Sequence, residues 1–211
     1  MKNSLGMLGE SLNSIFEQFE NKILEPKVRD HYGAVQYESA RVNNLLMQLL
    51  ALYKLENEQL PFNPNYYNLG DFLEEQSCKF IPLMKAKGIN YQIKVAEDLE
   101  AVFDDNLMAT VLENIIGNAI RYTKSQIHIS CSFDRLLTIQ IADDGPGYPK
   151  QMIELAGDYI QGIDQSTGST GLGLVFAKKI AELHSHKDVK GNITLSNGGE
   201  LGGGIFEIKI P

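Results

Sequence analysis

Two long amphipathic stripes near the amino end most constrain how this chain can fold. Over residues 5–23, and again over residues 32–53, apolar side chains recur every three or four positions, which is the spacing of one helical face. Pro26 separates the stripes, and the sequence NEQLPFNPN ends the second one. Two long helices joined by a short link predict an antiparallel hairpin. A lone hairpin cannot bury both stripes, so we expect residues 1–60 to form a four-helix bundle as a homodimer; alternatively, the stripes pack on the rest of the chain.

The sequence changes character after Tyr67. LGDFLEEQSCKFIPLMKAKG reads as one helix and NYQIKVA as a strand, and QIHISCSF and LLTIQIA alternate like a hairpin of half-solvated strands. A helix from about Gly171 to His184 and two strands, NITLS and GIFEIKI, complete the pattern. We therefore predict an α+β fold for residues 67–211, an α/β sandwich whose mixed sheet is covered by helices on one face.

Composition excludes several classes of partner. The chain has 211 residues and a formal net charge of −8, without a dense Lys/Arg block, which argues against binding nucleic acid or an anionic membrane. Cys78 and Cys131 lie far apart and form no CxxC pattern, so we expect neither a disulfide framework nor a zinc site, and a reducing compartment. The most apolar stretch, LLMQLLALY, is too short to cross a bilayer. We expect a cytoplasmic chain without direct membrane contact, although the complete protein could be soluble or membrane-anchored.

The sequence ENIIGNAIRYT carries two amides where a helix core is expected. In a helix beginning at about Asn106, Asn114 and Asn118 are four residues apart and lie on one face. Buried amides without partners cost about 1–3 kcal/mol each, so this pair needs something to bond. Neutral oxygen donors suit Mg²⁺, which takes the rest of its shell from water and phosphates. Alternatively, the amides are surface polar groups or bond a neighbouring loop.

A second segment, ADDGPGYP, follows directly on an expected strand. Gly145 and Gly147 permit turns and close ligand approach, and the fixed carboxylate of Asp143 could accept a hydrogen bond from an exocyclic amino group. Because D-G and P-G are common turn dipeptides, an ordinary turn is the alternative.

A third segment, GSTGLGLVFAKKI, opens a helix with glycines. Free N–H groups and the positive dipole end at a helix N-terminus favour phosphate. The segment has no G-K-[ST] sequence and does not follow a strand, so it is neither a P-loop nor a dinucleotide-binding fingerprint. Alone, it is weak evidence for a phosphate site.

Together, the order and spacing of the three segments resemble the N, G1 and G2 boxes of the histidine-kinase catalytic domain, from the ATPase superfamily that includes DNA gyrase. The resemblance covers Tyr67 to Pro211 and implies binding of ATP with Mg²⁺. It implies that Asn118 coordinates the metal, that Asn114 shares in holding metal and phosphates, and that Asp143 accepts the adenine amino group. The remaining residues implied to bind nucleotide are Arg121, Tyr122, Gly145, Gly147, Thr170, Gly171, Leu172 and Gly173.

The resemblance also implies a mobile ATP lid from Tyr148 to Thr170. The family's Phe-containing box is not recognisable there, and Tyr159 is the candidate replacement.

The first sixty residues resemble the family's dimerisation and phosphotransfer hairpin. MKNSLGML begins inside the phosphoacceptor box, so Asn3 occupies its polar, catalytic position, and the acceptor His and its acidic neighbour would lie just before Met1. The four histidines present are interpreted as structural or surface residues: His31, His128, His184 and His186.

The resemblance therefore implies the catalytic region of a two-component sensor histidine kinase. Such a protein transfers the γ-phosphoryl group of ATP to a histidine and then to an Asp of a response regulator receiver domain. We expect this chain, without the acceptor, to be unable to autophosphorylate. The alternatives are a non-catalytic dimeric nucleotide-binding scaffold and, less favoured by the hairpin, a protein-serine kinase of the same superfamily.

Overall fold

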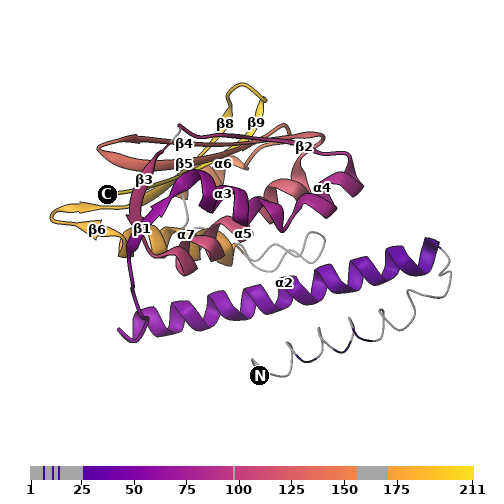
Figure 1. The fold of residues 1–211 in the computed structure, drawn as a ribbon, viewed down its shortest axis with the longest axis horizontal. Coiled ribbons are helices and arrows are strands. Elements are labelled where there is room, and N and C mark those ends of the chain that lie inside the picture. The colour runs from indigo at the N-terminus through magenta and orange to yellow at the C-terminus, as the bar shows by residue number, and fades with distance from the viewer. Residues whose placement is uncertain (1–6, 8–10, 12–13, 15–25, 97, 156–170) are drawn as a thin grey trace. The chain divides into compact units, whose positions relative to one another are not determined.

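The structure is a computed structural model that describes residues 7, 11, 14, 26–96, 98–155 and 171–211, with the backbone alone over 26–40 (Figure 1). The chain divides into two compact units, Met1–Asn57 and Glu58–Pro211. The assignment of the first unit as a phosphotransfer hairpin stays a prediction.

The first unit contains one long described helix, α2 (Pro26–Glu56), which includes the whole second apolar stripe. Proline is well tolerated in the first turn of a helix, where its missing N–H would have no partner within the helix. The predicted first helix of the hairpin lies outside the described residues, apart from Met7, Ser11 and Ser14, which are helical. None of the helices in the described part of the chain combines the length and apolarity that a bilayer crossing requires.

The second unit is built on a five-stranded sheet with the strand order β2-β4-β5-β9-β8. Its strands are β2 (Asn90–Lys94), β4 (Gln126–Asp134), β5 (Leu136–Asp143), β8 (Asn192–Gly198) and β9 (Gly203–Ile210). Strand β2 runs parallel to β4, and all other neighbours are antiparallel. The predicted mixed sheet is therefore confirmed.

The β4–β5 hairpin shows why these sequences form strands. Ile129 pairs with Ile141 in the antiparallel register, and both side chains are buried. Their sequence neighbours point to the other face, because side chains alternate along a strand. Arg135, with a positive φ of 63°, makes the turn between the two strands.

Helices cover one face of this sheet, as Figure 1 shows for α3 (Leu69–Cys78), α5 (Asp105–Tyr122) and α7 (Leu172–Leu183). Apolar side chains of the helices and of the inner sheet face form the core between the two layers. Its largest fully buried members include Phe103, Phe176, Phe206, Leu69, Leu73, Met84, Met108, Leu112, Ile115, Ile116, Ile120 and Ile127. The predicted α+β sandwich is confirmed.

One predicted helix is interrupted in the structure. Residues 69–88 form two helices, α3 and α4 (Ile81–Lys87), instead of one. Pro82 explains the break, because in a continuous helix it would lack the N–H that bonds the carbonyl of Cys78, and its ring would clash with that carbonyl.

Several short elements were not predicted. Strands β1 (Asn65–Asn68) and β3 (Glu100–Phe103) form an antiparallel pair, as do β6 (Ser185–His186) and β7 (Val189–Lys190). A short helix, α6 (Lys150–Leu155), occupies part of the expected lid. Each element has six residues or fewer, which is too short for a clear periodic pattern.

The two cysteines have different surroundings. Cys131 is buried on the inner face of β4, and burial raises the pKa of its thiol to about 12. Cys78, at the end of α3, is exposed.

Candidate functional site

Helix α5 places the two predicted amides beside its buried stripe. The stripe packs into the core, whereas Asn114 and Asn118 are half-buried at its border. The Nδ2 atom of Asn114 is itself buried and has no hydrogen-bond partner among the described residues. An unpaired buried amide nitrogen is costly, which makes Asn114 a candidate for contact with a ligand.

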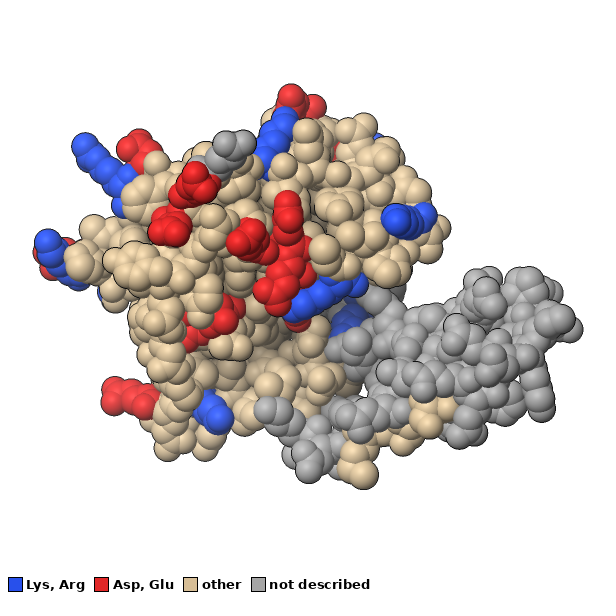
Figure 2. Space-filling model, viewed as in Figure 1, with Lys and Arg blue, Asp and Glu red and all other residues tan. Residues whose placement is uncertain are grey.

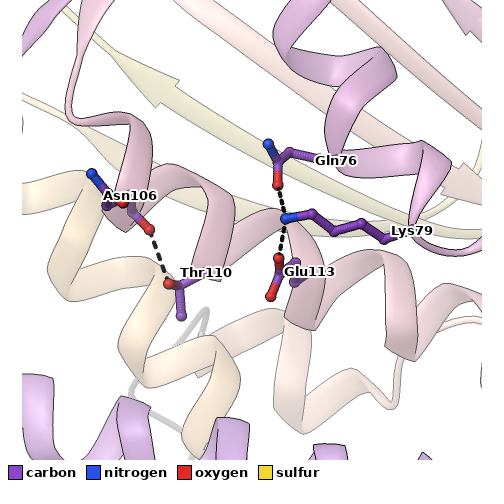
Figure 3. A network of polar contacts seen from close by, with 5 residues as sticks. All are labelled: Gln76, Lys79, Asn106, Thr110 and Glu113. Carbon is purple, nitrogen blue, oxygen red and sulfur yellow. Dashed lines mark hydrogen bonds and ion pairs between the residues drawn. The ribbon is translucent and has the colours of Figure 1, made fainter.

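Glu113, next to Asn114, fixes α5 to the preceding helix pair. Figure 3 shows Lys79 between Gln76 and Glu113, with its Nζ 2.7 Å from Gln76 Oε1 and 2.5 Å from Glu113 Oε1. One turn earlier, the Thr110 hydroxyl donates to the carbonyl oxygen of Asn106 at 2.9 Å. Because both charges are partly exposed, the ion pair contributes about 0–1 kcal/mol and acts mainly as a positional contact.

Asn114 lies against the glycine-rich start of α7. Gly171 begins this helix with a positive φ of 70°, and Gly173 is buried in its first turn beside Leu172, which is half-buried. A Cβ atom added at Gly173 would overlap both the nitrogen and the oxygen of the Asn114 amide. The structure therefore brings together the Asn segment and the Gly-rich helix start, and only glycine leaves room for this contact.

Asp143 ends β5 with a carboxylate that is 8% exposed. Its Oδ1 accepts hydrogen bonds from the N–H groups of Gly145 at 2.7 Å and Gly204 at 3.3 Å. Its Oδ2 accepts none from the residues that the structure describes. Burial raises the pKa of the Asp143 carboxyl, and the two backbone hydrogen bonds oppose that rise. One carboxylate oxygen is thus held in place, while the other can accept a hydrogen bond from a ligand.

The neighbouring Asp144 has a structural role instead. It accepts hydrogen bonds from the Thr123 hydroxyl at 2.5 Å, from the Lys124 N–H at 2.8 Å, and from the Ser125 N–H and hydroxyl at 3.0 and 2.8 Å. Burial acts to raise the pKa of the Asp144 carboxyl, but these hydrogen bonds outweigh it and hold the pKa well below its usual range. Asp144 therefore fixes the end of α5 to the turn that contains Asp143.

The remaining predicted residues are placed as follows. Arg121 is half-buried and Tyr122 is 39% exposed at the end of α5. A Cβ added at Gly145 would lie 2.5 Å from the carbonyl oxygen of Tyr122, so this helix end abuts the turn after β5. Asn3 and Thr170 lie outside the described residues.

The structure adds two contributions to the site that sequence reasoning missed. Asn197, on β8, accepts a hydrogen bond from the Tyr148 N–H at 2.6 Å and donates to the Tyr148 carbonyl at 2.8 Å, which holds the chain just after Gly147. Gly204, on β9, allows close approach, because a Cβ there would lie 3.0 Å from Asp143 Oδ2 and 3.1 Å from the Tyr148 ring. The Gly-Gly-Gly run at residues 202–204 was the only sequence signal for this second contribution.

A groove elsewhere on the second unit contains none of the predicted site residues. Its volume is about 370 Å³, and it lies between β1, α3 and the start of α5. Acidic side chains gather over these helices on the face shown in Figure 2, in keeping with Asp71, Glu75 and Asp105 among the groove's lining residues. Among the described residues, no group of three His, Cys, Asp or Glu side chains could hold a metal ion.

A family model described as "Histidine kinase-, DNA gyrase B-, and HSP90-like ATPase" matches residues 103–211, more than half of the chain. The chain belongs to this ATPase family, and the predicted histidine-kinase type of ATPase domain is confirmed.

Known proteins similar to this chain include sensor histidine kinases. The sensor histidine kinase WalK of Bacillus subtilis is 29% identical over 176 residues, which cover 79% of this chain and 28% of WalK. The chain thus spans less than a third of that relative's length.

Solved structures share the fold. The catalytic domain of the histidine kinase ThkA matches with a TM-score of 0.61 and 25% identity over 71% of this chain and 95% of that one. Full-length ShkA in complex with AMPPNP matches with a TM-score of 0.66 and 20% identity over 100% of this chain and 46% of that one. The second unit therefore has the histidine-kinase catalytic-domain fold.

Proposed function

We propose that this chain is the cytoplasmic catalytic region of a two-component sensor histidine kinase and that it binds ATP with Mg²⁺. The observation that carries the proposal is the pairing of two half-sites along α5. Near Asn114, an unpaired buried amide meets Gly173; at the other end, Tyr122 abuts the turn that holds Asp143. Tyr122 lies eight positions after Asn114, which corresponds to about 12 Å of helix.

This arrangement suits an elongated ligand with chemically different ends. The two hydrogen bonds to Asp143 Oδ1 hold the carboxylate in place. Its Oδ2 atom would then accept a hydrogen bond from the exocyclic amino group of adenine. Gly171 and Gly173, in the first turn of α7, would line the phosphates, because free N–H groups and the positive dipole end there favour anions. The AMPPNP bound to ShkA supports a nucleotide as the ligand.

The donor set also fits Mg²⁺. Asn118 and Asn114 offer neutral amide oxygens, which bind hard cations, and a metal held by so few protein ligands would take the rest of its shell from water and phosphate oxygens. When bound, Mg²⁺ would neutralise phosphate charge. The two Asn side chains would orient the phosphates, and Arg121, three residues after Asn118 on α5, would add a positive charge near them.

The reaction we propose is phosphoryl transfer from ATP to a histidine imidazole and then to an aspartate of a response regulator receiver domain. The similarity of most of this chain to the sensor histidine kinase WalK supports this assignment. Catalysis would consist mainly of positioning and charge stabilisation, because phosphoryl transfer needs little covalent chemistry from the protein.

We also propose that residues 1–60 make the chain a homodimer. On α2, Val42, Leu49 and Tyr53 are 46%, 56% and 61% exposed, and their spacing of seven and four residues places them on one helical face. An exposed apolar stripe of this kind favours association with a second helix pair. Light scattering at high concentration should give the mass of a dimer; a monomer mass would refute this part of the proposal.

Calorimetric titration tests the nucleotide site directly. Mg-ADP or Mg-ATP should bind with a dissociation constant in the micromolar to millimolar range that is common for enzyme substrates. GTP serves as the matched control, because it carries an oxygen where adenine has its amino group and so offers Asp143 no donor at that position. No heat with any adenine nucleotide, or equal affinity for GTP, would refute the adenine assignment.

Incubation with γ-labelled ATP tests the kinase. The chain should bind ATP without acquiring acid-labile label, because its four histidines do not match the acceptor position. Adding His and then Glu before Met1 should restore labelling. Label on the present chain would show that the acceptor is misassigned, and an unlabelled extended chain that still binds nucleotide would favour a scaffold.

A further inference from the structure

A buried hydrogen-bond cluster joins three segments of the second unit at the end of α5 away from Tyr122. Asp104, which is 3% exposed, accepts from the Leu107 N–H at 3.0 Å through Oδ1 and thereby caps α5. Its Oδ2 accepts from the Asn63 N–H at 2.7 Å, and its own N–H donates to His184 Nε2 at 3.0 Å. One residue thus connects α5 with residue 63 and with the residue that follows α7.

His184 completes the cluster as a neutral imidazole with one defined tautomer. Its Nε2 accepts from a backbone N–H, so its Nδ1 carries the proton and donates to the Ile180 carbonyl oxygen at 2.8 Å. The ring is 4% exposed and packs edge-on against Phe62, with ring centres 4.9 Å apart. Both ring nitrogens of His184 are therefore hydrogen-bonded, and its ring also contacts the ring of Phe62.

Helices α5 and α7 are consequently joined at two places. At one, His184 bonds Asp104; at the other, Gly173 touches Asn114. The two contacts are ten residues apart on α5 and eleven on α7, about 15–17 Å of helix, and their order makes the helices antiparallel. Because both contacts lie on the same two rigid helices, a shift at the His184 end would be carried along the helix axes to the contact between Asn114 and Gly173.

Residues 58–64 provide the third connection. This segment begins two residues after the last residue of α2 and ends just before β1, and it contributes the Phe62 ring and the Asn63 N–H to the cluster. We propose that His184 is a positioning residue which, through Asp104, couples residues 58–64 to the spacing of α5 and α7 and so sets the affinity for nucleotide. The inference rests on the proposed function, because it concerns the same nucleotide site.

The first test compares two substitutions of His184. His184→Leu removes both polar contacts, and we expect Mg-ADP to bind about tenfold more weakly, a typical size for coupling between distant sites. His184→Gln keeps an acceptor for the Asp104 N–H and should bind within about twofold of the parent. His128→Leu, on the outer face of β4, is the matched control and should bind like the parent. Affinities are measured where melting curves show every variant folded.

The second test addresses the 58–64 segment. Asn63→Pro deletes the N–H that bonds Asp104, whereas Asn63→Ala keeps it, and the Asn63 side chain is exposed. We expect several-fold weaker Mg-ADP binding for the Pro variant only. Because coupling is reciprocal, saturating Mg-ADP should also slow hydrogen exchange of the Asn63 amide in the parent but not in His184→Leu.

Folded His184→Leu and Asn63→Pro variants that bind Mg-ADP as tightly as the parent would overturn the inference while leaving the proposed function intact. If His184→Leu does not fold, the comparison of Mg-ADP binding by Asn63→Pro and Asn63→Ala tests the inference by itself. A parent chain that binds no adenine nucleotide would refute the proposed function, and this inference with it.

Discussion

Replacing Asp143 by Asn should abolish nucleotide binding without unfolding the protein. The Asn carbonyl oxygen can still accept from the Gly145 and Gly204 N–H groups, so the amide nitrogen takes the place of Oδ2. The ligand's amino group then meets a donor instead of a charged acceptor. Losing a hydrogen bond to a charged group costs about 1.5–3 kcal/mol, and the facing donors add to this, so affinity should fall at least about 100-fold.

Unlike the nucleotide affinity, the stability of the folded protein should not fall on this substitution. Burial raises the pKa of the Asp143 carboxyl, so the folded state disfavours its charge, and a neutral amide should leave the melting temperature unchanged or slightly higher. Asp144→Asn is the matched control, because its carboxylate accepts several hydrogen bonds from residues 123–125 that an amide nitrogen cannot accept. It should cost about 1–2 kcal/mol of stability. Titration calorimetry and thermal melts separate the two effects; an Asp143→Asn protein that binds adenine nucleotide normally would refute the reasoning.

Three further predictions concern the other half-site and the buried cluster. Gly173→Ala places a methyl group on the Asn114 amide, so it should lower the free energy of unfolding by about 1–3 kcal/mol and should also weaken nucleotide binding. An unchanged melting temperature would mean that the two helices separate easily. Asn118→Ala should weaken binding of Mg-ADP more than binding of metal-free ADP, because its proposed role is metal ligation; equal losses would contradict that role. Burial lowers the pKa of His184, although its hydrogen bond to Ile180 and the Asp104 charge oppose this, so the folded state takes up its proton less readily than the unfolded state. The stability that His184 contributes should be complete above about pH 6.5 and should decrease as the pH falls below that value. The melting temperature of His184→Gln should therefore fall less than that of the parent over the same pH range.

The long elements of the second unit could be predicted because their patterns repeat over many residues. Helix α5 has 18 residues with a continuous apolar stripe, and the β4–β5 hairpin alternates over two strands of 9 and 8 residues. The alternation even distinguishes the two neighbouring aspartates, since Asp143 continues the buried series of Ile139 and Ile141 whereas Asp144 does not.

Other features depend on contacts between residues far apart in sequence. The hydrogen bond between Asn197 and Tyr148 joins residues 49 positions apart in sequence, and the one between His184 and Asp104 joins residues 80 apart. No local sequence pattern predicts either pair. Pro82 does indicate the break between α3 and α4, but the apolar pattern continues on both sides of it, so the pattern alone predicts one continuous helix.

The unequal surroundings of the two cysteines make the chain convenient for attaching a spectroscopic probe. A thiol reacts as its thiolate, so burial and the pKa of about 12 protect Cys131 from alkylation, whereas Cys78 is open to reagents. A maleimide dye would therefore attach at one place without any mutation. That place is next to Lys79, whose contact with Glu113 leads to Asn114, so the emission of the dye could report directly on events around α5.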